Sequence, residues 1–108
     1  MAYLRCNKCA VISQPMAGKS AREILEARKR ATKELRRLGF AVLNSYYPNV
    51  EQSAGDCRHP SLRLLAKCLD VMANCEASYF CKGWENARGC RIEHEAAQNY
   101  GLAIIYEE

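Results

Sequence analysis

The sequence has no apolar run long enough to cross a membrane. Its longest runs, residues 41–43 and 102–105, are far shorter than the roughly 20 residues that a membrane-spanning helix needs. Residues 1–19 also lack the apolar centre of a signal peptide. We therefore expect a cytoplasmic protein that does not bind membranes.

The sequence also has little excess charge of one sign. Its formal net charge is +4, and most of this net charge lies in residues 22–37, where Glu23, Glu26 and Glu34 interrupt the basic residues. Mixed charge of this kind is typical of a solvated helix face, so we expect no binding to a nucleic acid polymer. A mildly positive surface still favours a phosphorylated small ligand.

The cysteines do not complete a recognisable metal site. Cys6 and Cys9 form one Cys-x-x-Cys pair, which is half of a zinc site, and Cys57 with His59 lacks the usual finger spacing. Without a secretion signal, reduced thiols are expected. We predict no metal and no cofactor; a zinc site or a redox pair at Cys6 and Cys9 remains an alternative. Three other cysteines are predicted to be small core residues: Cys68, Cys75 and Cys81.

The pattern of apolar residues predicts one α/β domain over residues 1–108. Short apolar runs alternate with longer amphipathic segments in the order β-α-β-α-β-α-β. The predicted strands are residues 10–13, 40–43, 77–81 and 102–106. The predicted helices begin at a Ser20/Glu23 capping box, at Pro60, and near Arg88 or Gly89, and the first and third end at Gly39 and Gly101.

Strands that alternate with helices form a parallel sheet. We therefore predict a small three-layer parallel sheet of four to five strands, flavodoxin-like or Rossmann-like, with helices on both faces. The helix from Pro60 is expected to be largely buried, and the long loop of residues 44–59 suggests a lid. Because so small a sheet leaves apolar surface uncovered, we expect a homo-oligomer whose partner helps to close each site.

A first candidate site follows the first strand, at residues 13–20. The segment ends in Gly18, Lys19 and Ser20 like a P-loop, but Ser13 replaces the first glycine of that motif and Pro15 lacks an N–H. An ATP-hydrolysing P-loop is therefore not expected. A ribose or phosphate subsite near the helix N-terminus and a plain connection without a ligand both remain open.

A second candidate site follows the third strand, in residues 83–97. Gly83 and Gly89 allow close approach of a ligand, and Glu93 lies in the early turns of the helix, facing the same opening. A carboxylate there is also favourable with the helix dipole and needs no function. The Trp84 ring is suited either to anchoring the core or to stacking on a base. The Tyr46 ring is likewise suited either to packing within the loop or to stacking on a ligand. His94 and Glu95 are expected to be surface or interface groups.

Several short segments together resemble the nucleoside 2-deoxyribosyltransferase-like family, within a branch of short bacterial and phage domains. The resemblance runs from about Ala10 to Tyr106, through Ile12-Ser13-Gln14-Pro15-Met16-Ala17-Gly18-Lys19, Asn44-Ser45-Tyr46-Tyr47-Pro48, Ala77-Ser78-Tyr79-Phe80, Gly83-Trp84-Glu85-Asn86-Ala87-Arg88-Gly89-Cys90-Arg91-Ile92-Glu93-His94-Glu95 and Tyr100-Gly101. It implies that Glu93 is a nucleophile that attacks the anomeric carbon of a 2′-deoxyribose and expels the base.

The family's two aspartates do not align cleanly, and Asp70 or Glu85 would have to replace the missing acid. The resemblance therefore leaves two functions open. One is cleavage or transfer of the N-glycosidic bond of 2′-deoxynucleosides or their 5′-monophosphates. The alternative is a non-catalytic protein that sequesters a nucleotide or an ADP-ribose-like signal. Both take a small-molecule nucleoside or nucleotide, with ligand contacts expected from Ser13, Gln14, Pro15, Met16, Gly18, Tyr46, Gly83, Trp84, Asn86 and Gly89.

Overall fold

The secondary structure follows the predicted alternation of strands and helices. The computed structural model describes residues 8–47 and 57–108. None of the helices in these residues is long and apolar enough to span a membrane. The elements are β1 (Cys9–Ser13), α1 (Ala21–Arg37), β2 (Ala41–Val42), α2 (Pro60–Met72), β3 (Ala77–Phe80), the 3-10 turn η2 (Trp84–Asn86), α3 (Arg88–Asn99) and β4 (Ala103–Tyr106).

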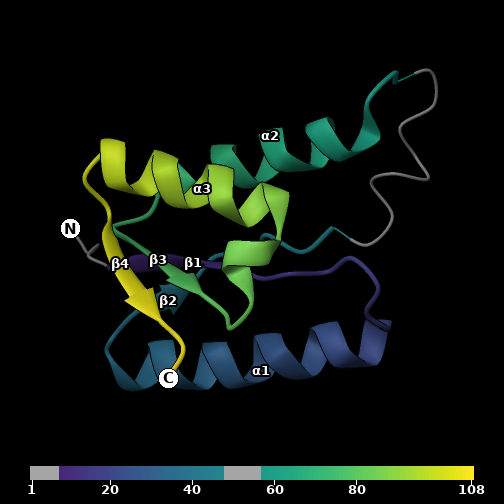
Figure 1. The fold of residues 1–108 in the computed structure, drawn as a ribbon. Helices are drawn as coiled ribbons and strands as arrows, with labels where there is room; N and C mark the ends of the chain where they lie inside the picture. Colours follow the sequence, from purple (N-terminus) through teal and green to yellow (C-terminus); the bar gives the residue numbers. More distant parts are fainter. Residues whose placement is uncertain (1–7, 48–56) are drawn as a thin grey trace.

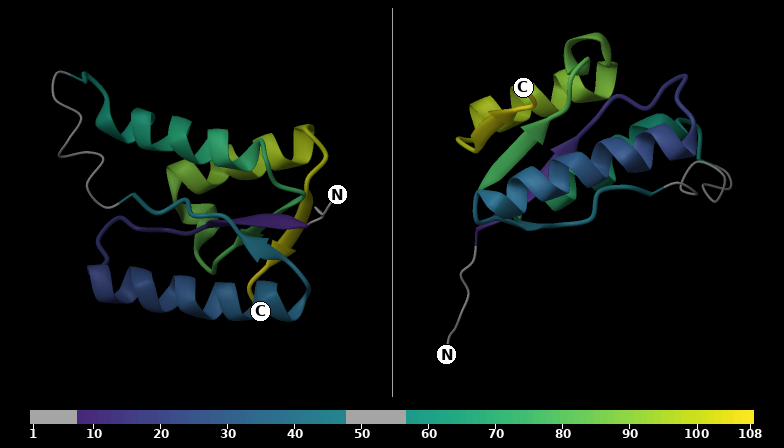
Figure 2. Two further views of the ribbon diagram at one scale, coloured as in Figure 1. Left: turned by 180° about the vertical axis from the view of Figure 1, so that it is seen from behind. Right: turned by 90° about the horizontal axis from the view of Figure 1, so that it is seen from below.

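The four described strands form one parallel sheet in the order β2-β1-β3-β4. Helix α1 covers one face of the sheet, and α2 and α3 lie side by side on the other face (Figure 1). The views from behind and from below show the same three layers (Figure 2). This arrangement confirms the predicted α/β class and its three-layer architecture.

The N-terminus of α1 is fixed by the predicted capping box. The Ser20 hydroxyl oxygen accepts a hydrogen bond from the Glu23 N–H at 3.1 Å, and the Glu23 carboxylate accepts one from the Ser20 N–H at 2.8 Å. These bonds satisfy N–H groups that have no partner within the helix. The helix then buries Ile24, Ala31 and Leu35 on one stripe.

Strand β1 directs alternate side chains to the two faces of the sheet, as its period of two requires. Ala10 and Ile12 belong to the core beneath α1, whereas Val11 belongs to the core beneath α2 and α3. The same alternation continues at the end of the strand. Ser13 therefore faces α3, and Gln14, directly after it, faces α1.

Two elements differ from their predicted form. Strand β2 has two residues instead of four, and α2 is not largely buried: Met72 is its only fully buried residue, and Leu62 is 60% exposed. The N-terminal half of α2 extends past the carboxyl ends of the strands (Figure 1), so no sheet lies beneath it. Of the predicted lid, residues 48–56 lie outside the described residues.

The three cysteines predicted to be core residues differ in burial. Cys81 is buried, which confirms the prediction for this residue. Cys68 and Cys75 are only half-buried. Cys75 lies beyond the end of α2 and not on the helix, and Cys68 lines a cavity. The prediction for Cys68 was wrong, because this residue lines the cavity, whereas Cys75 is partly buried and packs against the core that contains Met72 and Phe80.

Candidate functional site

A cavity of about 1170 Å³ opens at the carboxyl end of β1. Its walls come from the β1–α1 connection and α1, from the segment after β2, from α2, and from the start of α3. From β1 the chain passes to β2 on one side and later returns to β3 on the other. The cavity thus lies at the switch point where parallel α/β sheets commonly bind small molecules.

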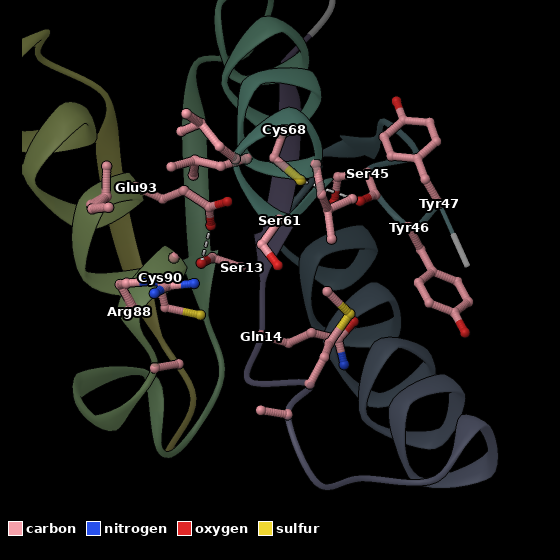
Figure 3. A pocket seen from close by; sticks show the side chains of 18 of the residues that line it. Ser13, Gln14, Ser45, Tyr46, Tyr47, Ser61, Cys68, Arg88, Cys90 and Glu93 are labelled. Carbon is pink, nitrogen blue, oxygen red and sulfur yellow. Dashed lines mark hydrogen bonds between the residues drawn. The ribbon is translucent and has the colours of Figure 1, made fainter. Parts of the chain in front are cut away.

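Glu93 lies on this cavity, in the second turn of α3 (Figure 3). It is 9% exposed, and its Oε1 accepts a hydrogen bond from the Ser13 hydroxyl. Ser13 is itself held in the sheet, because its carbonyl oxygen accepts a bond of 2.9 Å from the Cys81 N–H. A residue of β1 and a residue of α3, 80 positions apart in sequence, therefore fix the position of one carboxylate.

The surroundings of Glu93 oppose its ionisation. Burial raises the pKa of the Glu93 carboxyl, and hydrogen bonds from Ser13 and Cys68 partly counter that shift. Burial also raises the pKa of Cys68 to about 12 and that of Cys90 to about 11, so both thiols are neutral at physiological pH. Among the described residues that line the cavity, Glu93 is the only carboxylate.

A second polar group lines the cavity on the α1 side of β1. Arg28 donates a hydrogen bond from Nη1 to Gln14 Oε1 at 2.8 Å and one from Nη2 to the Ser45 hydroxyl at 3.2 Å. Gln14 in turn donates from Nε2 to the Ile24 carbonyl at 3.1 Å, and Ser45 donates to the Ile12 carbonyl at 3.0 Å. Burial lowers the pKa of the Arg28 guanidinium.

Two tyrosines from the segment after β2 extend this wall (Figure 3). The Arg28 guanidinium carbon lies 5.7 Å from the centre of the Tyr46 ring, and the Lys67 ammonium lies 5.7 Å from that of Tyr47. Both distances suit cation–π contacts. The Tyr47 hydroxyl donates to the Asn44 carbonyl at 3.2 Å. The tyrosines therefore supply flat apolar surface next to a cation.

The structure brings together seven of the predicted site residues. These residues line the one cavity: Ser13, Gln14, Met16, Tyr46, Asn86, Gly89 and Glu93. Pro15 and Gly83 lie beside it and pack on each other, since a Cβ at Gly83 would lie 3.5 Å from the Pro15 ring. Gly18 and the two candidate acids, Asp70 and Glu85, are exposed and are not part of the cavity wall.

Trp84 packs in an aromatic cluster away from the cavity wall. Its ring stacks on His94 at 4.1 Å between ring centres and lies 5.5 Å from Phe80. His94, expected to be a surface or interface group, is half-buried there and contacts the Tyr106 hydroxyl at 2.7 Å. Of the two interpretations of Trp84, this position fits the core anchor.

Several residues of the cavity were not selected as site residues from the sequence, among them Arg28, Ser45 and Cys90. Arg28 had a detectable signal, because it lies four residues after Ile24 and three before Ala31, within the buried stripe of α1. A charge at such a position indicates a side chain with a buried polar partner. Ser45 and Cys90 carried no comparable signal.

No group of three or more potential metal ligands occurs within residues 8–47 and 57–108. Cys6, half of the Cys-x-x-Cys pair, lies outside the described residues, so the alternative of a metal site there is not tested. The described lining of the cavity includes one carboxylate, the guanidinium groups of Arg28, Arg58 and Arg88, the imidazole of His59, hydroxyls, thiols and aromatic rings. These groups offer hydrogen bonds and apolar surface, but they do not form a metal-ligand cluster.

Comparison with curated proteins and with solved structures found no match to this chain. A family model does match, over residues 9–106, and its description is "Domain of unknown function (DUF4406)". The matched range includes all four strands and both sides of the cavity. The chain therefore belongs to the DUF4406 family.

Proposed function

We propose that this protein cleaves or transfers the N-glycosidic bond of a 2′-deoxynucleoside or its 5′-monophosphate, with Glu93 as the nucleophile. One observation carries the proposal: a buried carboxylate, oriented by Ser13, lines a cavity at the switch point of a parallel sheet. The likeness of the sequence to the nucleoside 2-deoxyribosyltransferase-like family supports the same role.

The reaction would proceed in two displacements. A carboxylate oxygen of Glu93 bonds to the anomeric carbon while the bond from that carbon to the base nitrogen breaks. The base leaves with the bonding electrons and takes a proton from solvent water. Water or a second base then attacks the same carbon and releases Glu93, as in a retaining glycosidase. The Ser13 hydrogen bond holds the nucleophile in one orientation, which favours attack.

A second candidate is a protein that binds a nucleotide, or an ADP-ribose-like signal, without cleaving it. The observation that favours it is the isolation of Glu93, since Asp70 and Glu85 are exposed and no second carboxylate lines the cavity among the described residues. A retaining mechanism normally needs an acid to protonate the leaving group. Binding alone requires no such group.

The enzyme assay uses deoxynucleosides and their 5′-monophosphates, with free base measured by chromatography and the intact protein by mass spectrometry. We expect release or exchange of base and a deoxyribosyl adduct on Glu93. Glu93→Gln should lower the rate by roughly a thousandfold or more. Because burial raises the pKa of Glu93, activity should fall on the acid side above the ordinary carboxyl value of 4.5.

Glu95→Gln is the matched control, because Glu95 is exposed on the same helix and does not line the cavity. It should leave the rate unchanged. Ligands that bind to the wild-type protein and are recovered intact, with equal affinity for Glu93→Gln, would support the binding protein instead. If no nucleoside or nucleotide is bound or cleaved, both proposals are wrong.

The proposal includes a homo-oligomer in the cytoplasm. Leu62 on α2 and Ile92 on α3 both line the cavity and are 60% and 43% exposed. A second copy that covered these side chains would bury apolar surface and narrow the opening. A reaction that forms an oxocarbenium-like centre benefits from such exclusion of water.

A further inference from the structure

Three arginines line the cavity among the described residues, Arg28, Arg58 and Arg88, and of these Arg28 is the one that is not exposed. Arg28 lies within the apolar stripe of α1, and its neighbours on that stripe, Ile24 and Ala31, are 8% and 1% exposed. Within residues 8–47 and 57–108, Arg28 is not part of any ion pair. Its two hydrogen-bond acceptors are an amide and a hydroxyl, which carry no charge.

The guanidinium is nevertheless held in place. Gln14 and Ser45 are 7% and 3% exposed, and each is bonded to a main-chain carbonyl. Because the amide nitrogen of Gln14 donates to Ile24, its oxygen is left to face Arg28. Two of the five N–H groups of the guanidinium are used by these contacts, and the others remain for a ligand.

A partly buried cation without a counter-ion is costly, and the cost falls when an anion binds. The lowered pKa of Arg28 has desolvation as its largest cause, and no described carboxylate is among the groups that oppose this shift. A planar guanidinium pairs with phosphate or carboxylate through two parallel hydrogen bonds. The wall of the cavity near α1 is therefore suited to an anion.

We propose that Arg28, positioned by Gln14 and Ser45, binds a phosphomonoester, so that the ligand of this cavity is a nucleotide and not an unphosphorylated nucleoside. The sugar and base of that ligand rest on the function proposed above, whereas the anion site rests on Arg28 and its contacts alone. The relative positions of Arg28 and Glu93 favour a phosphate over a carboxylate as the bound anion.

Ser13 and Gln14 are consecutive residues that hold opposite charges on the two sides of β1. Ser13 binds the Glu93 carboxylate, and Gln14 binds the Arg28 guanidinium (Figure 3 shows Ser13, Gln14 and Glu93). In a nucleoside 5′-monophosphate, the anomeric carbon and the phosphate are at opposite ends of one sugar. A ligand of this kind has one end to bind at Arg28 and the other to react at Glu93. The cavity, at about 1170 Å³, has room for a ligand of this size.

The test measures binding by calorimetry, with inorganic phosphate, sodium acetate, a 2′-deoxynucleoside and its 5′-monophosphate as the probes. We expect the monophosphate to bind at least about tenfold more tightly than the nucleoside. Inorganic phosphate should compete with it, and acetate should not. The affinity for the monophosphate should fall with added salt. It should rise as the pH increases through the second pKa of the phosphate, which is about 6.

Arg28→Met retains much of the apolar stem and removes the charge. We expect it to weaken monophosphate binding at least about tenfold and to leave nucleoside binding nearly unchanged. Lys29→Met is the matched control, because Lys29 is exposed on the same helix and the net charge changes equally. Gln14→Glu is a second variant, which keeps Arg28 and supplies an internal counter-ion; it should also weaken binding of the monophosphate.

The outcomes separate the anion site from the proposed reaction. Equal affinity of wild type and Arg28→Met for the monophosphate, or equal affinity of wild type for nucleoside and monophosphate, would overturn the anion site. Cleavage of unphosphorylated nucleosides that depends on Glu93 would then still support the reaction. Binding of monophosphate that depends on Arg28, without cleavage, would support the anion site and exclude the reaction.

Discussion

At the scale of single residues, the site depends on where the side chains of β1 point. Ser13 and Gln14 end the strand on opposite faces, and each holds one charged side chain from a helix. A carboxylate and a guanidinium are thus both partly desolvated near the same strand end, yet neither neutralises the other through an ion pair. Such an arrangement lowers the free energy of unfolding and leaves both charged groups available to a ligand.

Glu93→Gln is expected to stabilise the folded protein at neutral pH. Because burial raises the pKa of Glu93 above its unfolded value of 4.5, the folded state binds more protons than the unfolded state from about that pH upward. The free energy of unfolding of the wild type therefore decreases as pH rises through this window. The glutamine side chain of the variant carries no charge, so the variant avoids this decrease in the free energy of unfolding. Its melting temperature should therefore be a few degrees higher than that of the wild type at neutral pH.

Urea denaturation at several pH values checks this expectation. The advantage of Glu93→Gln should shrink as pH falls toward 4.5, where the carboxyl of the wild type becomes protonated. Glu95→Gln, on the exposed side of α3, should show no such dependence. An advantage that is absent at neutral pH would contradict the inferred burial of the charge.

At the scale of secondary-structure elements, α1 is the longest helix and forms one face of the site. It begins at a reciprocal capping box and buries three side chains against the sheet. The same stripe places Arg28 at the cavity. The position of the cation therefore depends on the helix beginning at the correct residue.

Ser20→Ala should lower the free energy of unfolding by about 1 kcal/mol, because the Glu23 N–H loses its acceptor. Ser20→Gly should cost only a few tenths of that, since glycine is tolerated at this position. Chemical denaturation of both variants tests the prediction. An unchanged free energy of unfolding in Ser20→Ala would show that the hydroxyl does not stabilise the helix.

The sequence predicted the elements better than their burial. The capping box, Pro60 and the helix-ending glycines are local signals, and they placed all three helices within about two residues. The exposure of Leu62 and the short β2 were not predictable in this way. They depend on how far α2 projects beyond the sheet, which follows from the packing of distant segments.

The site was predictable to a similar extent. Glu93 and the segment from Ser13 were found because they stand at strand ends followed by helices, which is a rule of topology. Arg28 was missed because a run of mixed charge on α1 resembled a solvated face, although its place in the apolar stripe distinguished it. The displacement of Trp84 into a cluster with His94 and Tyr106 required coordinates.

At the scale of the whole molecule, the exposed apolar residues near the cavity predict self-association. Leu62 and Ile92 lie on α2 and α3, and Leu25, 52% exposed, lies on α1 across the sheet. We expect the wild type to be a dimer or larger oligomer by size-exclusion chromatography with light scattering. Leu62→Glu should weaken association at least about tenfold, because it places a charge in the apolar contact.

Leu25→Glu introduces the same side chain on the opposite face and should leave the association unchanged. A wild-type chain that elutes as a monomer at every concentration would refute the homo-oligomer. Dissociation by Leu25→Glu but not by Leu62→Glu would place the contact on α1.

The pairing of Ser13 with Glu93 joins the start of the chain to its last helix. The proposed nucleophile and the proposed anion site lie in different halves of the chain, so their juxtaposition requires the intact fold. Ligand binding should consequently disappear in denaturant at the same midpoint as the helical signal. Binding measurements would then serve as a sensitive reporter of cooperative unfolding.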